Sequence, residues 1–360
     1  MFATTDWPEQ LSPHEWRTLA IPFAAGAEAR FHACRTARWF APFFARTFGV
    51  RTWGYHWYTC FSLAPDRFVW ERRSGTADDP LWVVSIGGRK SHGLVGSLGK
   101  YTRLRKLEPM IAVDPARIGE EGGYDRVADL YDAAFADIRV REDEWTWLQE
   151  HLPGDTSRKL RVVDIGCGNG SLLAALADRV EAGYGFDASP EMVARASARF
   201  GDHEQLAFAA IDGPRIPLEE NSIDVALSFL SFRYLDWDPI IDEIARVLRP
   251  EGRLLIVDMA AAPVGLGDLP ALVSSKLRHR RQSRAHPAFR GALRELVGDP
   301  DWKQMVAHNP VRAEHEYRWY LASRFPRGEI ATLNTSATHK LLAFDSGRID
   351  AMQRSRLTYP

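Results

Sequence analysis

The middle of the chain, residues 118 to 260, alternates between short apolar runs and apolar stripes at helical spacing. The short runs lie at residues 160–165, 183–186, 206–211, 223–230 and 253–259. Between them apolar residues recur every three or four positions, as in the stripe from Ile240 to Leu248 that ends before Pro250. Short strands that alternate with helices indicate a parallel sheet covered by helices on both faces.

The first 117 residues have a different pattern and hold seven of the twelve tryptophans of the chain. A helical stripe is expected over residues 28–48, with a break or kink at Pro42. Residues 52–61 alternate with period two and predict a strand, and two further strands are expected at 67–72 and 81–86. We expect residues 1–117 to form an aromatic-rich α+β accessory domain with a small antiparallel sheet.

The C-terminal part begins with an Arg-rich stretch at residues 261–310, where we expect a helical cap insertion. A helix is predicted at 314–324, and an edge hairpin of two strands at 329–333 and 340–344. The expected fold class is therefore α/β, with a doubly wound Rossmann-like sheet in a domain of residues 118–360.

Composition narrows the classes of function. The chain has 360 residues, of which 45% are hydrophobic and 26% charged, and a net charge of −1 that gives no overall attraction to nucleic acid or anionic membrane. No secretory signal pattern and no apolar run of membrane-spanning length, about 18 residues, is found. Cys34, Cys60 and Cys167 have no disulfide or zinc spacing. We expect a cytoplasmic protein without a metal site and without a membrane partner.

A glycine-rich loop follows the first strand of the middle region, in the sequence Asp-Ile-Gly-Cys-Gly-Asn-Gly from Asp164 to Gly170. Glycines allow a tight turn with positive φ and let a ligand approach the backbone closely. Asp187 ends the second strand, where a carboxylate can accept hydrogen bonds from both hydroxyls of a ribose. Asp212 follows the third strand, within reach of an adenine amino group.

These strand-end features, together with the sequence Arg-Val-Leu-Arg-Pro-Glu-Gly-Arg from Arg246 to Arg253, resemble class I S-adenosylmethionine (SAM)-dependent methyltransferases over residues 124–260. A NAD-type Rossmann domain is the alternative. The resemblance assigns the following residues to SAM binding: Asp164, Gly166, Cys167, Gly168, Gly170, Asp187, Ala188, Met192, Asp212, Ser228 and Phe229. It implies that the glycines line the methionine part, that Asp187 binds the ribose, that Ala188 and Met192 lie near the adenine, and that Ser228 and Phe229 pass under the sulfonium. Core packing is the alternative for Met192.

A helix upstream of the first strand carries one apolar face that includes Tyr124 and Tyr131. In the methyltransferases that this chain resembles, such a helix closes over the cofactor, and one of its tyrosines contacts the methionine carboxylate or the substrate. Either Tyr124 or Tyr131 is therefore a candidate lid residue. An amphipathic docking helix would show the same stripe.

The acceptor side is expected in the loop at residues 231–234, by the same resemblance. The Asn-Pro-Pro-aromatic signature of methylases that act on base or amide nitrogen is absent there, which disfavours DNA and protein-amide substrates. Arg233 is a candidate for binding a substrate carboxylate, Tyr234 for bounding the methyl site, and His315 for a general base, although spacing does not select it over His286 or His308.

The basic run from Arg278 to Arg284 is a solvated face, the mouth of a site for an anionic small molecule, or an RNA contact. The run lacks the interleaved aromatic residues that nucleic-acid binding favours. The aromatic N-terminal region is a candidate wall of the acceptor pocket or a candidate homodimer interface, and core packing of its aromatic strands is the alternative.

The sequence therefore predicts a methyltransferase that moves a methyl group from SAM to oxygen or carboxylate of a small organic acceptor in specialised metabolism. Two alternatives keep SAM. One is a SAM-consuming cyclase or an enzyme of rearrangement, and the other is a non-catalytic subunit that binds SAM.

Overall fold

The computed structural model describes residues 13–33, 36, 40–55, 58–62, 82–86, 107–108, 110–115, 124–154, 158–211, 213, 215–235, 237–262, 266–308, 311–312, 314–336 and 339–350. The chain divides into two compact units. The first consists of residues 1–122, 263–267 and 304–310, and the second of residues 123–262, 268–303 and 311–360. The main boundary lies at residue 122, five residues beyond the expected end of the accessory domain.

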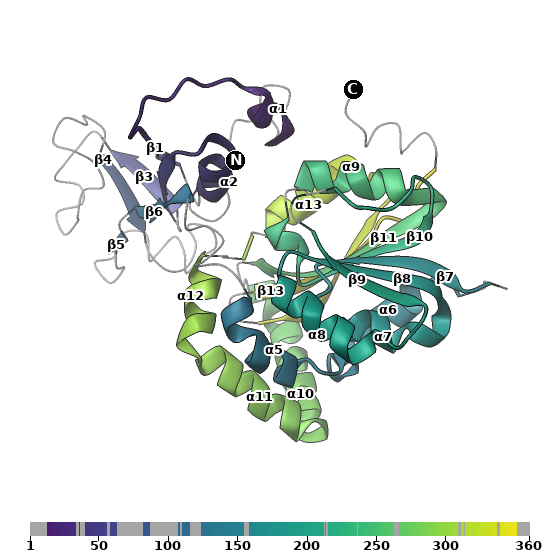
Figure 1. Cartoon of the computed structure of the whole chain (residues 1–360). Helices are drawn as coiled ribbons and strands as arrows, with labels where there is room; N and C mark the ends of the chain where they lie inside the picture. The colour runs from purple at the N-terminus through teal and green to yellow at the C-terminus, as the bar shows by residue number, and fades with distance from the viewer. Residues whose placement is uncertain are drawn as a thin grey trace. The chain divides into compact units, whose positions relative to one another are not determined.

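The second unit is built on a seven-stranded sheet with the strand order β12-β13-β11-β10-β7-β8-β9 (Figure 1). Its strands are β7 (Leu160–Ile165), β8 (Val180–Asp187), β9 (Leu206–Ala210), β10 (Ile223–Phe229), β11 (Leu248–Ala261), β12 (Glu329–Thr335) and β13 (His339–Asp345). The five strands from β7 to β11 pair in parallel, whereas β13 pairs antiparallel with both β11 and β12. The expected doubly wound α/β sheet is confirmed, including the hairpin at its edge.

Numbered within this unit, the first five strands run 3-2-1-4-5 across the sheet, which is the order of doubly wound dinucleotide-binding folds. The order reverses between β7 and β10, since β8 follows on one side of β7 and β10 lies on the other. In open parallel sheets the ligand site lies outside the carboxyl ends of the strands at such a switch point. The topology therefore points to the residues after Ile165 and Phe229.

Helices cover both faces of this sheet (Figure 1). The helices of the second unit are α5 (Ala128–Ala134), α6 (Glu142–His151), α7 (Ser171–Ala175), α8 (Pro190–Phe200), α9 (Trp237–Val247), α10 (Leu269–Ala285), α11 (Pro287–Gly298) and α13 (Glu314–Arg324). Alternate residues of β7 enter opposite cores, Val163 with α9 and α13, and Val162 with α6 and α7. Because both faces are buried, these strands appear in the sequence as continuous apolar runs.

The region expected to be an inserted cap contains α10, α11 and α12 (Pro300–His308). Helix α11 packs on α5 through Leu296, which is fully buried, and half-buried Phe289 and Leu293. No helix of the described residues is long and apolar enough to cross a bilayer.

The first unit contains two three-stranded sheets, with the orders β1-β2-β6 and β3-β4-β5. Its elements are α1 (Pro13–Thr18), β1 (Glu28–Arg30), α2 (Phe40–Phe48), β2 (Arg51–Gly54), β3 (Tyr58–Ser62), β4 (Trp82–Ile86), β5 (Leu107–Glu108) and β6 (Ile111–Val113). Phenylalanine rings pack edge to face in the core around α2, as between Phe31 and Phe44, whose ring centroids are 4.9 Å apart.

Two expectations for this unit were wrong. The helix expected at 28–48 begins only at Phe40, and its first residues form β1, which pairs in parallel with β2. The single strand expected at 52–61 is two strands in two different sheets, because alternation of side chains does not show where the chain changes sheet. The strand expected at 81–86 is present as β4, whereas the one expected at 67–72 lies outside the described residues.

Candidate functional site

The glycine loop at the end of β7 has a backbone conformation that favours glycine at three positions. Gly166, Gly168 and Gly170 have φ of 77°, 53° and 75°. A Cβ on Gly166 would lie 2.3 Å from the Cβ of Ser231, and one on Gly170 would lie 2.8 Å from the ring of Phe208. The backbone of the loop thus packs directly against the strand ends beside it. At Gly168 a Cβ would meet only ordinary contacts, the nearest at 3.5 Å.

Asp187 ties the end of β8 to this loop. The Gly168 N–H donates to its Oδ2 at 2.8 Å, and the Ser189 N–H donates to its Oδ1 at 2.9 Å. Burial raises the pKa of this carboxyl, and the backbone donors oppose that rise. The residue as a whole is half-buried.

Asp164, just before the glycines, is the unusual group of the loop. It is 2% exposed, and its Oδ1 has no hydrogen-bond partner among the described residues. A buried carboxyl without a partner is costly to the fold. Such a group fits a site that is completed by a ligand with N–H donors.

Replacing Asp164 by asparagine should remove a pH dependence of stability. Burial, and to a lesser degree the charge of Asp187, raises the pKa of the Asp164 carboxyl from 3.8 to about 8. Between these values the native state keeps a proton that the unfolded chain releases. Its contribution to stability is fully present below pH about 4 and is lost as pH rises through about 8. Urea unfolding of the ligand-free protein should therefore show a steeper loss of stability with pH in the wild type than in Asp164→Asn, and equal slopes would contradict a buried neutral carboxyl.

Two serines, one at the end of β10 and one in the loop after it, bind the last residue of β7. Ser228, fully buried, and Ser231 both donate to the carbonyl oxygen of Ile165, at 3.1 and 2.7 Å. Their hydroxyls are also 2.8 Å apart. Between them Leu230 has a φ of 58°, a left-handed conformation that is uncommon for a non-glycine residue.

Tyrosines from distant parts of the chain meet near the loop after β10. Tyr124 and Tyr234 share a hydrogen bond of 3.1 Å between their hydroxyls, although they are 110 residues apart. Tyr131 packs edge to face on Tyr124 with ring centroids 5.3 Å apart, and its ring lies 3.6 Å from the position of a Cβ on Gly168. Burial raises the pKa of Tyr124 and of Tyr131, so both hydroxyls keep their protons at neutral pH.

Arg233 lies deep in the same cluster. Its backbone N–H and its Nη1 donate to the two carboxylate oxygens of Asp258, both at 2.6 Å, and its Nη2 donates to the Tyr234 hydroxyl at 2.9 Å. The side chains of Arg233 and Asp258 are 7% and 1% exposed. Asp258 neutralises the charge of this guanidinium. The remaining hydrogen bond of Arg233 holds the Tyr234 hydroxyl in place.

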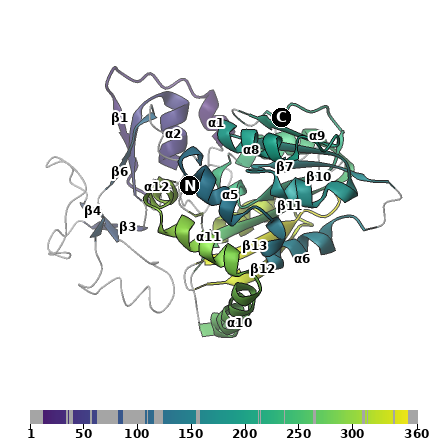
Figure 2. The same ribbon diagram turned by 60° about the horizontal axis from the view of Figure 1, so that its bottom comes forward.

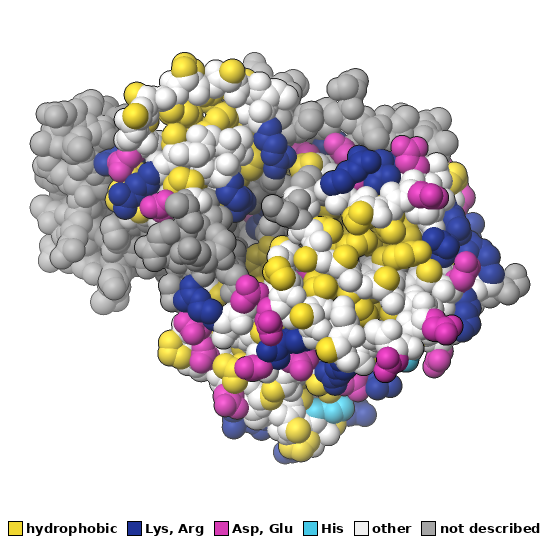
Figure 3. Space-filling view, in the orientation of Figure 1, with side chains coloured by type: hydrophobic (Ala, Val, Ile, Leu, Met, Phe, Trp, Pro, Cys, Tyr) yellow, Lys and Arg dark blue, Asp and Glu magenta, His cyan; other side chains and the backbone are white. Residues whose placement is uncertain are grey.

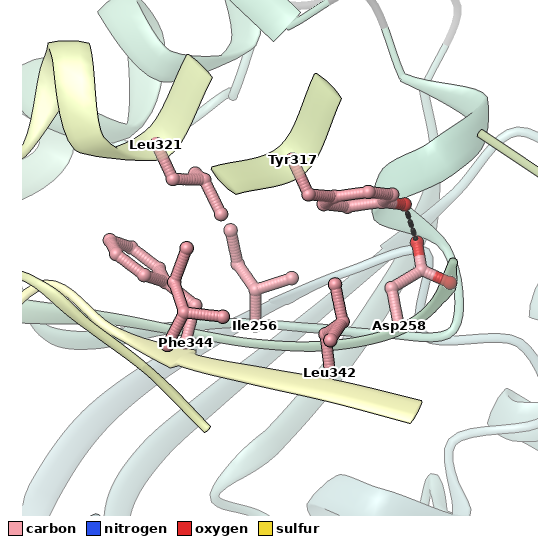
Figure 4. A pocket seen from close by; sticks show the side chains of 7 residues that line it. Ile256, Asp258, Tyr317, Leu321, Leu342 and Phe344 are labelled. Carbon is pink, nitrogen blue, oxygen red and sulfur yellow. Dashed lines mark hydrogen bonds between the residues drawn. The ribbon is translucent and has the colours of Figure 1, made fainter. Parts of the chain in front are cut away.

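A residue of α13 also donates a hydrogen bond to Asp258. The Tyr317 hydroxyl donates to its Oδ2 at 2.7 Å, which Figure 4 shows across a small cavity. The cavity is otherwise lined by the apolar side chains of Ile256, Leu321, Ile330, Leu342 and Phe344. The cavity belongs to the core between the sheet and α13. Asp258 connects this core to residues 231–234, which we call the acceptor loop after their predicted role.

A comparison with known families locates the domain. The model of the methyltransferase domain family matches residues 163–256, which include the glycine loop, Asp187 and Ser228. These residues form a class I SAM-dependent methyltransferase domain. The cofactor of the domain is SAM.

Relatives match the methyltransferase domain over limited lengths. The 27-O-demethylrifamycin SV methyltransferase of Amycolatopsis mediterranei is 31% identical over 171 residues, which are 42% of this chain and 62% of that protein. The uncharacterized methyltransferase YcgJ of Bacillus subtilis is 34% identical over 170 residues, 46% of this chain and 62% of that one. A sterol 4-C-methyltransferase of Caenorhabditis elegans is 28% identical over 29% of this chain. The chain spans between 33% and 62% of the length of the relatives named here.

One solved structure, a SAM-dependent methyltransferase from Aquifex aeolicus, aligns with 64% of this chain and 98% of its own at 18% identity and a TM-score of 0.36.

The remaining residues expected to bind SAM differ in how far they are buried. Met192 is 1% exposed, and its Cε lies 3.5 Å from the position of a Cβ on Gly168. Ala188 is exposed, and Phe229 is half-buried and packs toward the α6 side of the sheet. Cys167 is a free thiol, 7% exposed, and burial raises its pKa. Asp212 lies outside the described residues.

The histidines considered as a general base are not placed in the site by the described part of the structure. His315 lies in α13, but its side chain is outside the described part of the structure. The ring of His286 contacts Glu142 at 3.1 Å. Within the described residues, no group of three or more His, Cys, Asp or Glu side chains is placed to hold a metal ion.

Sequence reasoning missed the residues that hold the acceptor loop. Asp258 and Tyr317 fix Arg233, and Arg312 donates to the carbonyl oxygens of Arg233 and Leu235 at 3.3 and 3.2 Å. A charged residue inside the otherwise apolar run of β11 was the available signal for Asp258. No local pattern marks Tyr317 or Arg312, because both act on residues far away in the sequence.

Proposed function

We propose that the chain is a SAM-dependent methyltransferase that acts on a small organic molecule. The observation that carries the proposal is the buried carboxylate oxygen of Asp164, which has no partner among the described residues and lies next to a loop built around positive-φ glycines. SAM carries an ammonium group with N–H donors, and a ligand of that kind would satisfy Asp164. The residues present therefore fit the cofactor.

In the proposed site Asp164 and the backbone of Gly168 hold the methionine part of SAM, and Asp187 accepts the ribose hydroxyls. Asp187 is suited to that role because it is already oriented by two backbone N–H donors. Tyr131, against Gly168, covers the site from the side of α5 and excludes water. Bound there, SAM supplies a methyl group on a positively charged sulfur.

The acceptor side is proposed to be formed by Tyr234 and Tyr124. Arg233 donates to the Tyr234 hydroxyl and so favours donation by that hydroxyl to a neighbouring acceptor, a role open to the Tyr124 hydroxyl at 3.1 Å. A substrate oxygen that replaced Tyr124 as that acceptor would be oriented by the same hydroxyl. This arrangement supports an oxygen or carboxylate nucleophile, as do the names of two relatives, the rifamycin methyltransferase and a malonyl-[acyl-carrier protein] O-methyltransferase.

The proposed setting of the reaction is specialised metabolism in the cytoplasm. The rifamycin relative favours specialised metabolism, and the buried free thiol of Cys167 is compatible with a reducing cytoplasm. Transfer is proposed to rely on alignment and exclusion of water by the tyrosines.

The test is to incubate the purified protein with SAM and candidate acceptors and to identify the nucleoside product by mass spectrometry. Methyl transfer yields S-adenosylhomocysteine together with an acceptor heavier by one methyl group. Methylthioadenosine as the product would replace methylation by an internal cyclisation of SAM. If SAM binds but is not converted with any class of acceptor, the result would favour a non-catalytic subunit that binds SAM.

Replacing Tyr234 by phenylalanine should lower kcat about tenfold to a hundredfold and leave the Kd for SAM almost unchanged, since loss of a positioned donor affects the reacting oxygen and not the cofactor loop. The matched control is Tyr184→Phe. Tyr184 also accepts from an arginine, Arg161 at 3.0 Å, but it lies in the middle of β8. A similar loss of kcat in both variants would assign the Tyr234 hydroxyl a structural role only.

A further inference from the structure

Helix α10 packs onto its own domain through polar side chains. Ser275 accepts the backbone N–H of Thr335 at 3.2 Å, and Arg278 donates to the carbonyl oxygen of Leu333 at 3.0 Å. One turn further, Gln282 donates to the carbonyl oxygen of Val140 at 2.5 Å. Positions 275, 278 and 282 share one face of a helix. The inner face of α10 is therefore polar.

The opposite face presents apolar side chains to solvent. Leu269, Val273 and Leu277 are 52%, 60% and 60% exposed, and they lie four residues apart on one line along the helix. Val297 of the neighbouring α11 is 49% exposed. Surface helices normally bury their apolar stripe. In α10 the usual arrangement is reversed, so that aliphatic side chains stand in water while polar ones face the protein.

Basic side chains continue the same surface. Residues 269–294 contain seven Lys and Arg and no Asp or Glu, although the whole chain has a net charge of −1. Six of the seven are exposed and form no ion pair within the described part of the chain, whereas Arg278 pairs with Asp143 at 3.6 Å. These six are Lys276, Arg280, Arg281, Arg284, Arg290 and Arg294. Figures 1 and 2 show α10 beside α11, and Figure 3 shows hydrophobic and basic side chains next to one another at the lower edge of the view.

From these observations we propose that the outer face of α10 and α11 docks on an anionic lipid bilayer. The aliphatic side chains would enter the boundary between headgroups and acyl chains, and the arginines would contact lipid phosphates. The overall charge of the chain gives no sign of this surface, because acidic residues elsewhere cancel it. The proposal concerns peripheral contact and is independent of the reaction that the methyltransferase domain carries out.

Other occupants match this face less well. Nucleic acid would use the cations but would leave the aliphatic stripe in contact with phosphates and water. A second copy of the chain would bring two sets of unpaired cations together. The centre of a protein interface is usually rich in aromatic side chains, and no exposed aromatic residue lies on α10 or α11.

The test measures binding of the full chain, without SAM, to sedimented vesicles of phosphatidylcholine alone or mixed with phosphatidylglycerol. The wild type should bind the anionic vesicles and bind neutral ones far more weakly. The triple variant Arg280→Gln, Arg281→Gln, Arg284→Gln should bind the anionic vesicles about a hundredfold more weakly, because each of the three arginines contributes about fivefold near an anionic surface. The triple variant Leu269→Ser, Val273→Ser, Leu277→Ser should also lose binding, although it keeps every charge.

The matched control is Arg215→Gln, Arg327→Gln, Arg348→Gln, which removes the same charge from exposed side chains outside α10 and α11, the first two of them 76% and 70% exposed. This control should bind like the wild type. An unchanged circular dichroism spectrum and SAM affinity would show that each variant is folded. Absence of vesicle binding, equal binding to neutral vesicles, or an equal loss in the control would overturn the proposal. So would a dimer that the serine variant abolishes, or a preference for an RNA oligonucleotide or an acidic protein over vesicles.

Discussion

Replacing Asp187 by alanine is expected to weaken SAM binding about a hundredfold or more. In the proposed site the carboxylate accepts both ribose hydroxyls, and each hydrogen bond to a charged group contributes about 1.5–3 kcal/mol. Its removal also leaves the N–H groups of Gly168 and Ser189 without this acceptor. The glycine loop stays bonded to β8 through the N–H groups of Gly166 and Cys167, which donate to the carbonyl oxygen of Phe186. Isothermal titration calorimetry of SAM and of S-adenosylhomocysteine measures the effect.

The matched control is Asp202→Ala, which removes a carboxylate from an exposed position after α8 and should leave the affinity unchanged. A Kd for Asp187→Ala within a few-fold of the wild type would remove Asp187 from the cofactor site. It would also refute the proposed placement of SAM along the glycine loop.

Replacing Asp258 by alanine is expected to lower the free energy of unfolding by about 3–5 kcal/mol, because it leaves the Arg233 guanidinium buried without its counter-charge. Asp258 accepts from Arg233 and from Tyr317, and its side chain is 1% exposed. Asp258→Asn keeps the size of the side chain and one acceptor, so its loss should be smaller. Urea unfolding followed by circular dichroism measures both variants.

An exposed ion pair provides the control for this prediction. Asp137 accepts from the Arg139 side chain at 2.8 Å and from the Arg139 backbone N–H at 3.0 Å, but the two side chains are 45% and 63% exposed. Asp137→Ala should therefore cost less than about 2 kcal/mol, for the exposed pair and the helix cap together. If Asp258→Ala were no worse than Asp137→Ala, the buried pair would not hold the acceptor loop.

The two predictions concern different parts of one site. Asp187 belongs to the cofactor side, whereas Asp258 is linked through Arg233 to Tyr234 on the acceptor side. Asp258→Asn should therefore alter kcat more than the Kd for SAM, and Asp187→Ala should do the reverse. This separation follows from the switch point of the sheet, which places β8 on one side of β7 and β10 and β11 on the other.

The sequence alone determined the strands of the seven-stranded sheet and several helices of the second unit, although it did not predict α6 (Glu142–His151). Strands such as β7 (Leu160–Ile165) and helices such as α13 (Glu314–Arg324) lie where the apolar pattern predicted them, because burial on both faces or on one stripe leaves a local periodic signal. The glycine loop and the acidic end of β8 were also visible, since each is a short segment whose backbone conformation depends on its own residues.

Tertiary structure alone decided how distant polar residues meet. The pairs Arg233–Asp258 and Tyr124–Tyr234 join residues 25 and 110 positions apart, and no local pattern shows which carboxylate or hydroxyl will face a given side chain. The same holds for β2 (Arg51–Gly54) and β3 (Tyr58–Ser62), which continue one alternation but belong to two sheets. It holds also for the reversed faces of α10, since the pattern of a helix shows that two faces differ but not which one the rest of the fold will cover. Periodicity depends on neighbours in the chain, whereas pairing and burial depend on contacts between segments that only the folded chain brings together.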